Sequence, residues 1–489
     1  MKLLRKERKK NDFDPERRKF LELIGKGALA VGIAALIGEV MYTHYISREI
    51  VQLTDIKKFV KPELPFVVVI VKPSGAIVRD EKMNKIFEST DHADAIQRAI
   101  NYVVEQGGGA VFLGLGEFIF KKSVVVDDFH GGLLIQGAGQ RVTRIRIAAD
   151  VRPFLFRNCS MIQIRDLEFT DPNGQQGTAK FCIHMSSVFR PVVENVTFYN
   201  VWGCIKLASY ANPSNSTREG VFVNIYGHSI RGRGIEIAKG VHDNIFANIF
   251  LGANSGGADN GLTFDVTLDW DTSPDIEGGN YLSNITVLGP WFHCIHILGW
   301  SELFADQLIL DSANYGIEFQ VQGKDSERIW FDNVWISVMS SDGIKMWSPE
   351  GRAVRNVYIH CRTVRYCSAK GVNLEPSAIY EDIDIQVDFM EGNGTDWVLP
   401  DNAKLRSRSG KVTITGDGTT TEFVVLDDLD NKLVLTDKYD VKLTATKYGC
   451  VPIITDFDGD GKKELVAKFL SAPADFETVD VYYYIRALT

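Results

Sequence analysis

A short pattern of a small, an aliphatic, a polar and an apolar residue recurs along the middle of the chain. Its apolar side chains stand two positions apart, which is the period of a β-strand and not of a helix. The apolar residues are therefore expected to point inward, with the polar residue between them pointing outward. The copies are W-G-C-I-K-L at Trp202, R-G-I-E-I at Arg233, N-G-L-T-F at Asn260, H-C-I-H-I at His293, Y-G-I-E-F at Tyr315, D-G-I-K-M at Asp342 and K-G-V-N-L at Lys370.

A second pattern, an amide or acid followed by alternating apolar residues, runs in step with the first. Its successive gaps are 29, 24, 36, 23, 26, 23 and 26 residues, and self-similarity near this period indicates a solenoid. Asn tolerates the left-handed backbone region, so a column of stacked side-chain amides is expected. The copies begin at Asn195, Asn224, Asn248, Asn284, Gln307, Asn333, Asn356 and Asp382.

Together the two patterns predict an all-β parallel β-helix, in which each coil lays its strands over those of the coil before. No single coil can bury its apolar face alone, so the inward residues form one continuous core. A leucine-rich repeat would need a tighter leucine spacing, and a propeller would need a period of about 40 residues or more. These two folds remain the structural rivals.

The outward polar residues of adjacent coils become neighbours about 4.8 Å apart in such a fold. The row consists of Lys206, Glu236, Thr263, His296, Glu318, Lys345 and Asn373. Glu236 and Asp265 are expected about 8 Å apart along a diagonal. That separation suits general acid and base work on a glycosidic bond. The candidate catalytic residues are Glu236, Asp265, His296 and Glu318; a merely solvated polar face is the alternative.

The longest gap between repeats contains an acidic insertion around a tryptophan, and insertions in solenoids often form the binding face. Such a loop suits a sugar ring or a calcium ion bridging to a uronate. Lys345 could neutralise a uronate, and Trp347 offers a stacking surface. The candidate substrate-binding residues are Asp269, Trp270, Asp271, Lys345 and Trp347.

An amphipathic helix is expected upstream of the repeats, because Ala93, Ile96, Ile100 and Val103 share one helical face. Asp91 can cap its N-terminus, and the glycines at 107–109 end it. The segment D-A-I-Q-R-A-I-N…G-G-G-A-V-F-L-G-L-G-E-F resembles the entry to the pectate-lyase-like superfamily, which includes polygalacturonases and phage tailspikes.

This resemblance covers roughly residues 66–399. It implies a right-handed parallel β-helix whose N-terminal helix caps the open end. It is much weaker for activity, because a fold does not fix its chemistry. The aspartates, G-H-G and R-I-K of polygalacturonases are missing, and so is a pectate-lyase arginine motif.

The repeats stop near residue 400, and residues 401–489 carry the alternating, turn-punctuated pattern of a small β-sandwich. This part resembles C-terminal modules of β-helical phage and surface proteins. Within it, D-F-D-G-D-G-K-K-E-L resembles a calcium loop, since alternate carboxylates around a glycine turn suit a hard cation. The candidate calcium ligands are Asp456, Asp458, Asp460 and Glu464; an acidic hairpin tip that binds no ion is the alternative.

The N-terminus differs in kind from the rest. Its first 20 residues hold nine Lys or Arg, and an uncharged stretch of only 12 residues, at 27–38, follows them. A membrane span needs about 20 apolar residues, so the segment reads as an export signal. Arg17 and Arg18 resemble a twin-arginine signal. We expect a signal or membrane anchor over residues 1–50 and a linker over 51–65; a basic amphipathic helix in a cytosolic protein is the alternative.

Composition adds two exclusions. The net charge of −9 argues against nucleic acid as a partner of the whole molecule. The seven cysteines lack metal-binding spacing and do not suggest a full disulfide framework, although one bridge between neighbouring repeats stays open.

We therefore expect an exported, surface-held protein that acts on a polysaccharide. The leading hypothesis is an enzyme, hydrolase or lyase, that cleaves an acidic or complex glycan in a groove of the β-helix. A non-catalytic glycan-binding adhesin or tailspike-like protein is the alternative. The resemblance to tailspikes implies a homotrimer as one oligomeric state, and nothing in the sequence requires it.

Overall fold

The computed structural model describes residues 65–178, 180–209, 216–267 and 278–400, together with the strands that follow residue 404. These residues belong to one unit, Pro65–Thr489. The expected signal or anchor at 1–50 and nearly all of the expected linker lie outside the described residues. Within the described part of the chain, no helix has the length and apolarity to cross a membrane.

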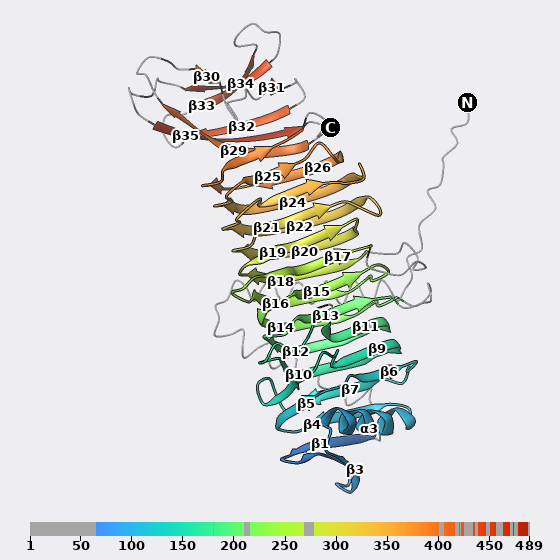
Figure 1. Cartoon of the computed structure of the whole chain (residues 1–489). Helices are drawn as coiled ribbons and strands as arrows, with labels where there is room; N and C mark the ends of the chain where they lie inside the picture. Colours follow the sequence, from blue (N-terminus) through green and yellow to red (C-terminus); the bar gives the residue numbers. More distant parts are fainter. Residues whose placement is uncertain are drawn as a thin grey trace, which may run out of the picture. The chain divides into compact units, whose positions relative to one another are not determined.

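Eleven parallel strands form one sheet, here called the site sheet, whose members stack in sequence order (Figure 1). Between them the chain returns through the other strands of each coil. The site sheet consists of β6 (Val124–Asp127), β9 (Phe154–Ser160), β11 (Phe181–Phe189), β13 (Gly203–Ala208), β15 (Arg233–Ala238), β17 (Ala258–Asp265), β19 (Trp291–Leu298), β21 (Tyr315–Gln320), β23 (Ile344–Trp347), β25 (Lys370–Leu374) and β28 (Thr395–Val398).

The remaining strands of the coils are long and bent, and they also pair in parallel from coil to coil. The fold is a parallel β-helix, as the repeats predicted. The bent strands are β10 (Ile162–Thr170), β12 (Val192–Tyr199), β14 (Val221–Ile230), β16 (Ile245–Ala253), β18 (Asn280–Leu288), β20 (Ser301–Asp311), β22 (Ser326–Ser337), β24 (Ala353–Arg365) and β26 (Ile379–Val387). The short β27 (Met390–Glu391) pairs with the end of β24.

The predicted column of amides lies where these strands bend. All eight predicted residues, from Asn195 to Asp382, have a positive φ between 50° and 63°. The side-chain amide of Asn224 donates to Asn195 at 3.0 Å, that of Asn248 to Asn224 at 3.2 Å, and that of Asn284 to Asn248 at 2.9 Å. Asp166 extends the column by one coil, because it accepts from Asn195 at 3.2 Å.

The small residue of the recurring pattern has a steric cause. A Cβ at Gly234 would lie 2.2 Å from the carbonyl oxygen of Gly261, and one at Gly343 would lie 2.6 Å from that of Gly371. Neither glycine has the positive φ that only glycine adopts easily. The position is small because the next coil's backbone lies against it. The buried Cys204 and Cys294 occupy the same column.

The N-terminal end contains the predicted helix, α3 (His92–Glu105), capped by Asp91, whose side chain accepts from the backbone N–H of Asp94. Its four predicted apolar residues are buried in the common core. Antiparallel strands that the repeats did not indicate precede it, and β1 pairs in parallel with β4. The elements here are β1 (Phe66–Lys72), β2 (Gly75–Asp80), β3 (Lys85–Ser89), β4 (Gly109–Leu113), β5 (Gly116–Phe120), β7 (Leu133–Gly137) and β8 (Thr143–Ile147).

The C-terminal part contains the predicted short strands, and most of them pair antiparallel. The first, β29 (Leu405–Thr415), continues from the solenoid by pairing in parallel with β26. The packing of these strands as a sandwich stays a prediction. The strands are β29 (Leu405–Thr415), β30 (Glu422–Val424), β31 (Val434–Leu435), β32 (Tyr439–Ala445), β33 (Cys450–Thr455), β34 (Lys463–Phe469) and β35 (Thr478–Ala487). All seven cysteines are free thiols.

Candidate functional site

The predicted polar row exists in the predicted register. Lys206 pairs with Glu236, Glu236 with Thr263, Thr263 with His296, His296 with Glu318, Glu318 with Lys345, and Lys345 with Asn373. Most of the row is nevertheless buried, with Glu236 only 1% exposed and Glu318 only 4%. The row is therefore not the solvated face that was the alternative. Its side chains pack on one another and on a second column of polar residues.

That second column stands three residues earlier on each strand. In it Arg233 pairs with Asn260, Asn260 with His293, and His293 with Tyr315. In β19 the step from His293 to His296 contains two buried residues, Cys294 and Ile295, so strict alternation is broken and both histidines share the outer face. This break explains why sequence reasoning assigned a role to His296 and overlooked His293.

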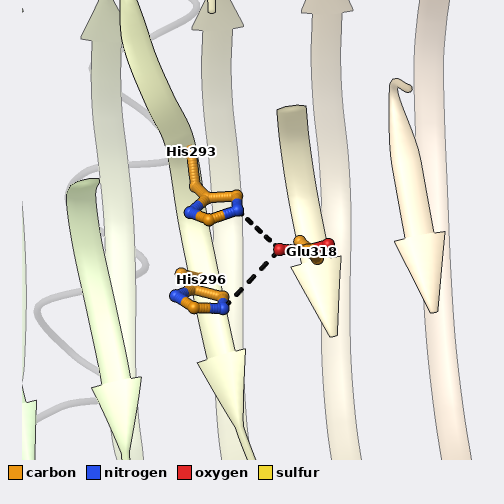
Figure 2. Close-up of side chains that lie close together, drawn as sticks. All are labelled: His293, His296 and Glu318. Carbon is orange, nitrogen blue, oxygen red and sulfur yellow. Dashed lines mark ion pairs between the residues drawn. The ribbon is translucent and has the colours of Figure 1, made fainter. Parts of the chain in front are cut away.

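His293, His296 and Glu318 form a compact cluster, here called the His–Glu cluster (Figure 2). The two imidazole rings stack at a centroid distance of 4.1 Å. Oε2 of Glu318 lies 2.5 Å from Nε2 of His293 and 3.6 Å from Nε2 of His296. The shorter contact lacks hydrogen-bond geometry, so Nε2 of His293 is a buried nitrogen without a hydrogen-bond partner among the described residues.

Neighbouring side chains fix the orientation of the cluster. The Oδ1 atom of Asn260 lies 2.8 Å from Nδ1 of His293, and Oε1 of Gln320 lies 3.3 Å from Nε2 of His296. The indole N–H of Trp347 donates to Oε1 of Glu318 at 3.0 Å. Oε1 of Glu318 is therefore occupied, while Oε2 faces both histidines.

Burial and the neighbouring charges shift the pKa of Glu318 in opposite directions. Burial alone raises its pKa, but the adjacent His293, His296 and Lys345 outweigh burial, and the pKa lies below its usual range. Burial lowers the pKa of His296 to about 4, and His293 contributes in the same direction. At neutral pH the cluster therefore contains a carboxylate beside an uncharged His296.

Lys345, a predicted substrate-binding residue, is paired with two carboxylates, and its binding of a uronate stays a prediction. Its Nζ lies 3.2 Å from Glu375 and 3.6 Å from Glu318, and it stands over the rings of Tyr315 and Trp347. Burial works against its charge, but these two carboxylates raise the pKa of Lys345 above its usual range. Glu375 and Tyr315 were not anticipated from the sequence, because neither belongs to the polar position of the repeat.

Glu236 and Asp265 occupy the other end of the row. Glu236 is paired with Lys206 at 2.6 Å and also with Arg233. Asp265 ends β17, where its Oδ1 accepts from the backbone N–H and the hydroxyl of Thr267 at 2.7 and 2.6 Å. Burial, and after it the charge of Glu236, raises the pKa of Asp265 above its usual range, although the bonds from Thr267 oppose this.

The diagonal predicted for this pair follows from the register, since Glu236 pairs with Thr263 while Asp265 pairs with Ala238. The same geometry puts Asp265 on a diagonal to His296, which pairs with Thr263. Sheet spacings give about 8 Å for each diagonal. Asp265 thus lies on a diagonal to Glu236 on one side and to His296 on the other.

Several predicted residues lie outside the described part of the chain. They are Asp269, Trp270 and Asp271 of the acidic insertion, and Asp456, Asp458 and Asp460 of the calcium loop. Glu464 lies in β34, of which only the backbone is described at that position. Their roles stay predictions.

A second surface lies on the bent strands. Tyr281, Phe304, Trp330 and Tyr358 pair in turn across four coils, and the rings of Trp330 and Tyr358 stack at 3.9 Å. A cleft of about 690 Å³, here called the aromatic cleft, contains the last three of these rings beside polar groups. The polar groups are Arg328, Asn356, Asp382, Asp384 and Gln386.

Comparison with known proteins finds similarity only among solved structures. No family model matches the chain, and no curated protein matches it in sequence. A catalytic domain of a GH87 α-1,3-glucanase in complex with nigerose is 13% identical, with a TM-score of 0.46, over 63% of this chain and 66% of that chain, just under two thirds of its length.

Two other matches are similarly remote. The tailspike protein gp49 from Acinetobacter baumannii bacteriophage Fri1, a capsular polysaccharide depolymerase, is 12% identical, with a TM-score of 0.43, over 81% of this chain and 83% of that one. The A-module of the Azotobacter vinelandii mannuronan C-5 epimerase AlgE6 is 14% identical, with a TM-score of 0.39, over 64% and 94%. The structural neighbours are thus glycan-active β-helix proteins, and their activities belong to them.

Proposed function

We propose that this protein cleaves glycosidic bonds of a polysaccharide that lies along the polar row, with Asp265 as the proton donor. One observation carries the proposal: a buried carboxyl group with a raised pKa ends a strand on diagonals to a second carboxylate and to a neutral imidazole. Titratable groups whose environments drive their pKa values apart are typical of acid and base partners.

The roles follow from the contacts. Both hydrogen bonds from Thr267 reach Oδ1 of Asp265, so Oδ2 is the oxygen that carries the proton to the leaving group. Glu236, held by two cations, acts as a fixed charge that keeps this proton on Asp265. On the other diagonal, the neutral His296 and the carboxylate of Glu318 accept the proton of the attacking water. The separation of about 8 Å leaves room for that water.

The test is turnover on a panel of neutral and acidic polysaccharides, followed by reducing-end release. We expect Asp265→Asn to lower kcat by about 10²- to 10⁴-fold, the usual contribution of a general acid. Asp259→Asn is the matched control, because Asp259 is an exposed aspartate on the same strand. A folded Asp265→Asn protein with wild-type turnover would refute the assignment. Unsaturated products in place of hydrolysed ones would identify a lyase.

A non-catalytic glycan-binding protein is the second candidate, and the aromatic cleft favours it. Concave sites that join aromatic rings with a few polar groups are typical of ligand binding. This candidate predicts that the wild-type protein binds a polysaccharide without releasing reducing ends, and that Trp330→Ala weakens the binding. Turnover that Asp265→Asn removes would decide against it.

The expectations that concern other segments stay proposals based on the sequence. Export through a twin-arginine signal and retention at the membrane would be seen by cell fractionation of a protein with Arg17 and Arg18 replaced by lysine. Calcium binding by the 456–464 loop would be seen by calorimetry with an Asp458→Asn control. A homotrimer would be seen as a threefold mass in light scattering.

A further inference from the structure

We infer that the His–Glu cluster is a binding site for a transition-metal dication, of which Zn²⁺ is the best match. Nε2 of His293, Nε2 of His296 and an oxygen of Glu318 are ligand atoms that all lie within 4.8 Å of one another. Two imidazoles and one carboxylate are a ligand set that zinc takes in sites with an open coordination position. The inference goes beyond the proposed function: a bound ion would occupy the atoms of His296 and Glu318 that otherwise accept the proton, and would itself polarise the water. Metal binding is measurable whether or not a glycan is cleaved.

The hydrogen bond that His293 donates to Asn260 supplies an independent reason. Because Oδ1 of Asn260 can only accept, Nδ1 of His293 carries the hydrogen of this bond, and Nε2 is the ring nitrogen left for a metal. That nitrogen faces a carboxylate oxygen only 2.5 Å away. Nε2 is itself buried and has no hydrogen-bond partner among the described residues. This nitrogen and the facing carboxylate oxygen are the atoms that a metal ion would take as ligands once the side chains rotate apart.

The dimensions of the cluster fit one ion. Ligand atoms about 2.0–2.1 Å from a tetrahedral zinc stand roughly 3.3 Å apart. The two nitrogen-to-oxygen distances, 2.5 and 3.6 Å, lie on either side of that value. Small side-chain rotations therefore open the cluster to a single ion and need no movement of the strands.

The surroundings resemble the outer shell of a metal site. Metal-ligating histidines commonly donate their other N–H to an acceptor, as His293 does to Asn260, and ligating carboxylates are themselves hydrogen-bonded, as Glu318 is by Trp347. The weak 3.3 Å contact between Gln320 and His296 would be exchanged for the metal bond, which leaves the Gln320 amide oxygen nearby as a further ligand atom.

The ligand types select the metal class. Calcium and magnesium prefer oxygen ligands, whereas two imidazole nitrogens favour zinc and its d-block neighbours. The site is thus chemically distinct from the calcium loop predicted at residues 456–464. Lys345, 3.6 Å from the other oxygen of Glu318, opposes a nearby dication, and Glu375 offsets it at 3.2 Å.

The test is calorimetric titration of the metal-stripped full chain with Zn²⁺, in saturating Ca²⁺ so that the acidic loop does not compete. We expect one Zn²⁺ per chain in the wild type and no such binding in His293→Gln or Glu318→Gln. Asn260→Ala keeps all three ligands and should weaken Zn²⁺ by about 10- to 100-fold, the usual effect of removing an outer-shell partner.

His184→Gln is the matched control, since His184 is another buried histidine of the site sheet but has no carboxylate within ion-pairing distance among the described residues. It should bind Zn²⁺ like the wild type. Visible bands of bound Co²⁺ provide a second readout, and circular dichroism verifies folding. The inference fails if the wild type binds no Zn²⁺, or if the folded His293→Gln and Asn260→Ala proteins bind it as the wild type does. Neither result bears on turnover by Asp265.

Discussion

Asp265 combines two properties that are usually found on different residues: hydrogen bonds that fix its position and a raised pKa. Its Oδ1 closes a local turn with Thr267, while burial, and after it the charge of Glu236, raises the pKa of the side chain. A carboxyl group of this kind is both held in place by the backbone and able to donate. At the scale of single residues, the proposed chemistry therefore depends on the partner charge as much as on the acid.

Glu236→Gln should shift the pH profile of kcat/KM without abolishing turnover. The substitution removes the negative charge that helps to raise the pKa of Asp265, so this pKa falls. Since the donor must be protonated, activity is present below its pKa and lost above it. The alkaline limb should thus move to lower pH. Glu375→Gln, a carboxylate at the far end of the row, is the control and should leave that limb unmoved.

His360 should make stability depend on pH. Burial alone lowers its pKa, but Asp332 at 2.8 Å and Asp388 at 3.1 Å outweigh burial and raise it. A raised folded pKa stabilises the protein below the unfolded value of about 6.5, and the contribution disappears as pH rises through the folded value.

Chemical denaturation of the wild type and His360→Gln measures this contribution. The wild type should be more stable by about 0.5–1 kcal/mol at pH 5, because partly exposed ion pairs are worth little more. The difference should shrink as the pH approaches 8. A difference that grows with pH would contradict the assignment.

At the scale of elements, the small-residue column is what allows the coils to stack closely. Gly343→Ala should destabilise the protein by about 1–3 kcal/mol, the usual cost of overpacking. The added Cβ would lie 2.6 Å from the carbonyl oxygen of Gly371, which cannot yield without moving a strand, and 2.8 Å from a methyl group of Val364.

Gly256→Ala is the matched control, because the nearest atom to its Cβ is the side-chain oxygen of Asn254 at 3.5 Å. Thermal unfolding should separate the two variants clearly. Equal midpoints would show that the column has room for a Cβ.

The strands and their register could be predicted because each side chain of the repeat meets its own counterpart one coil later. That is why the amide column and the row from Lys206 to Asn373 follow from spacing alone. The His–Glu cluster could not be predicted in full, because strict alternation turns His293 away from His296. The antiparallel strands β1–β3 were not predicted either, because they occur once and do not belong to the repeat.

At the scale of the molecule, the described residues present two surfaces on different sheets. The polar row belongs to the site sheet, and the aromatic cleft belongs to the bent strands. The row concentrates titratable groups and the cleft concentrates rings, so the proposed catalysis and the proposed glycan binding fall on separate sheets. The fold follows from the repeat, whereas the division of tasks depends on which side chains the coils bring to each face.

This separation predicts that the two surfaces act independently. Trp330→Ala should weaken polysaccharide binding about tenfold by removing a stacking ring, while the kcat of the bound substrate stays unchanged. Asp265→Asn should lower kcat and leave polysaccharide binding unchanged. Residues that share no partners usually contribute additively, so the double variant should show the two effects multiplied. Trp335→Ala, on the same strand as Trp330 but outside the cleft, is the control. Coupling between the two substitutions would mean that one glycan chain must engage both faces at once, which would join the two proposed functions in a single binding event.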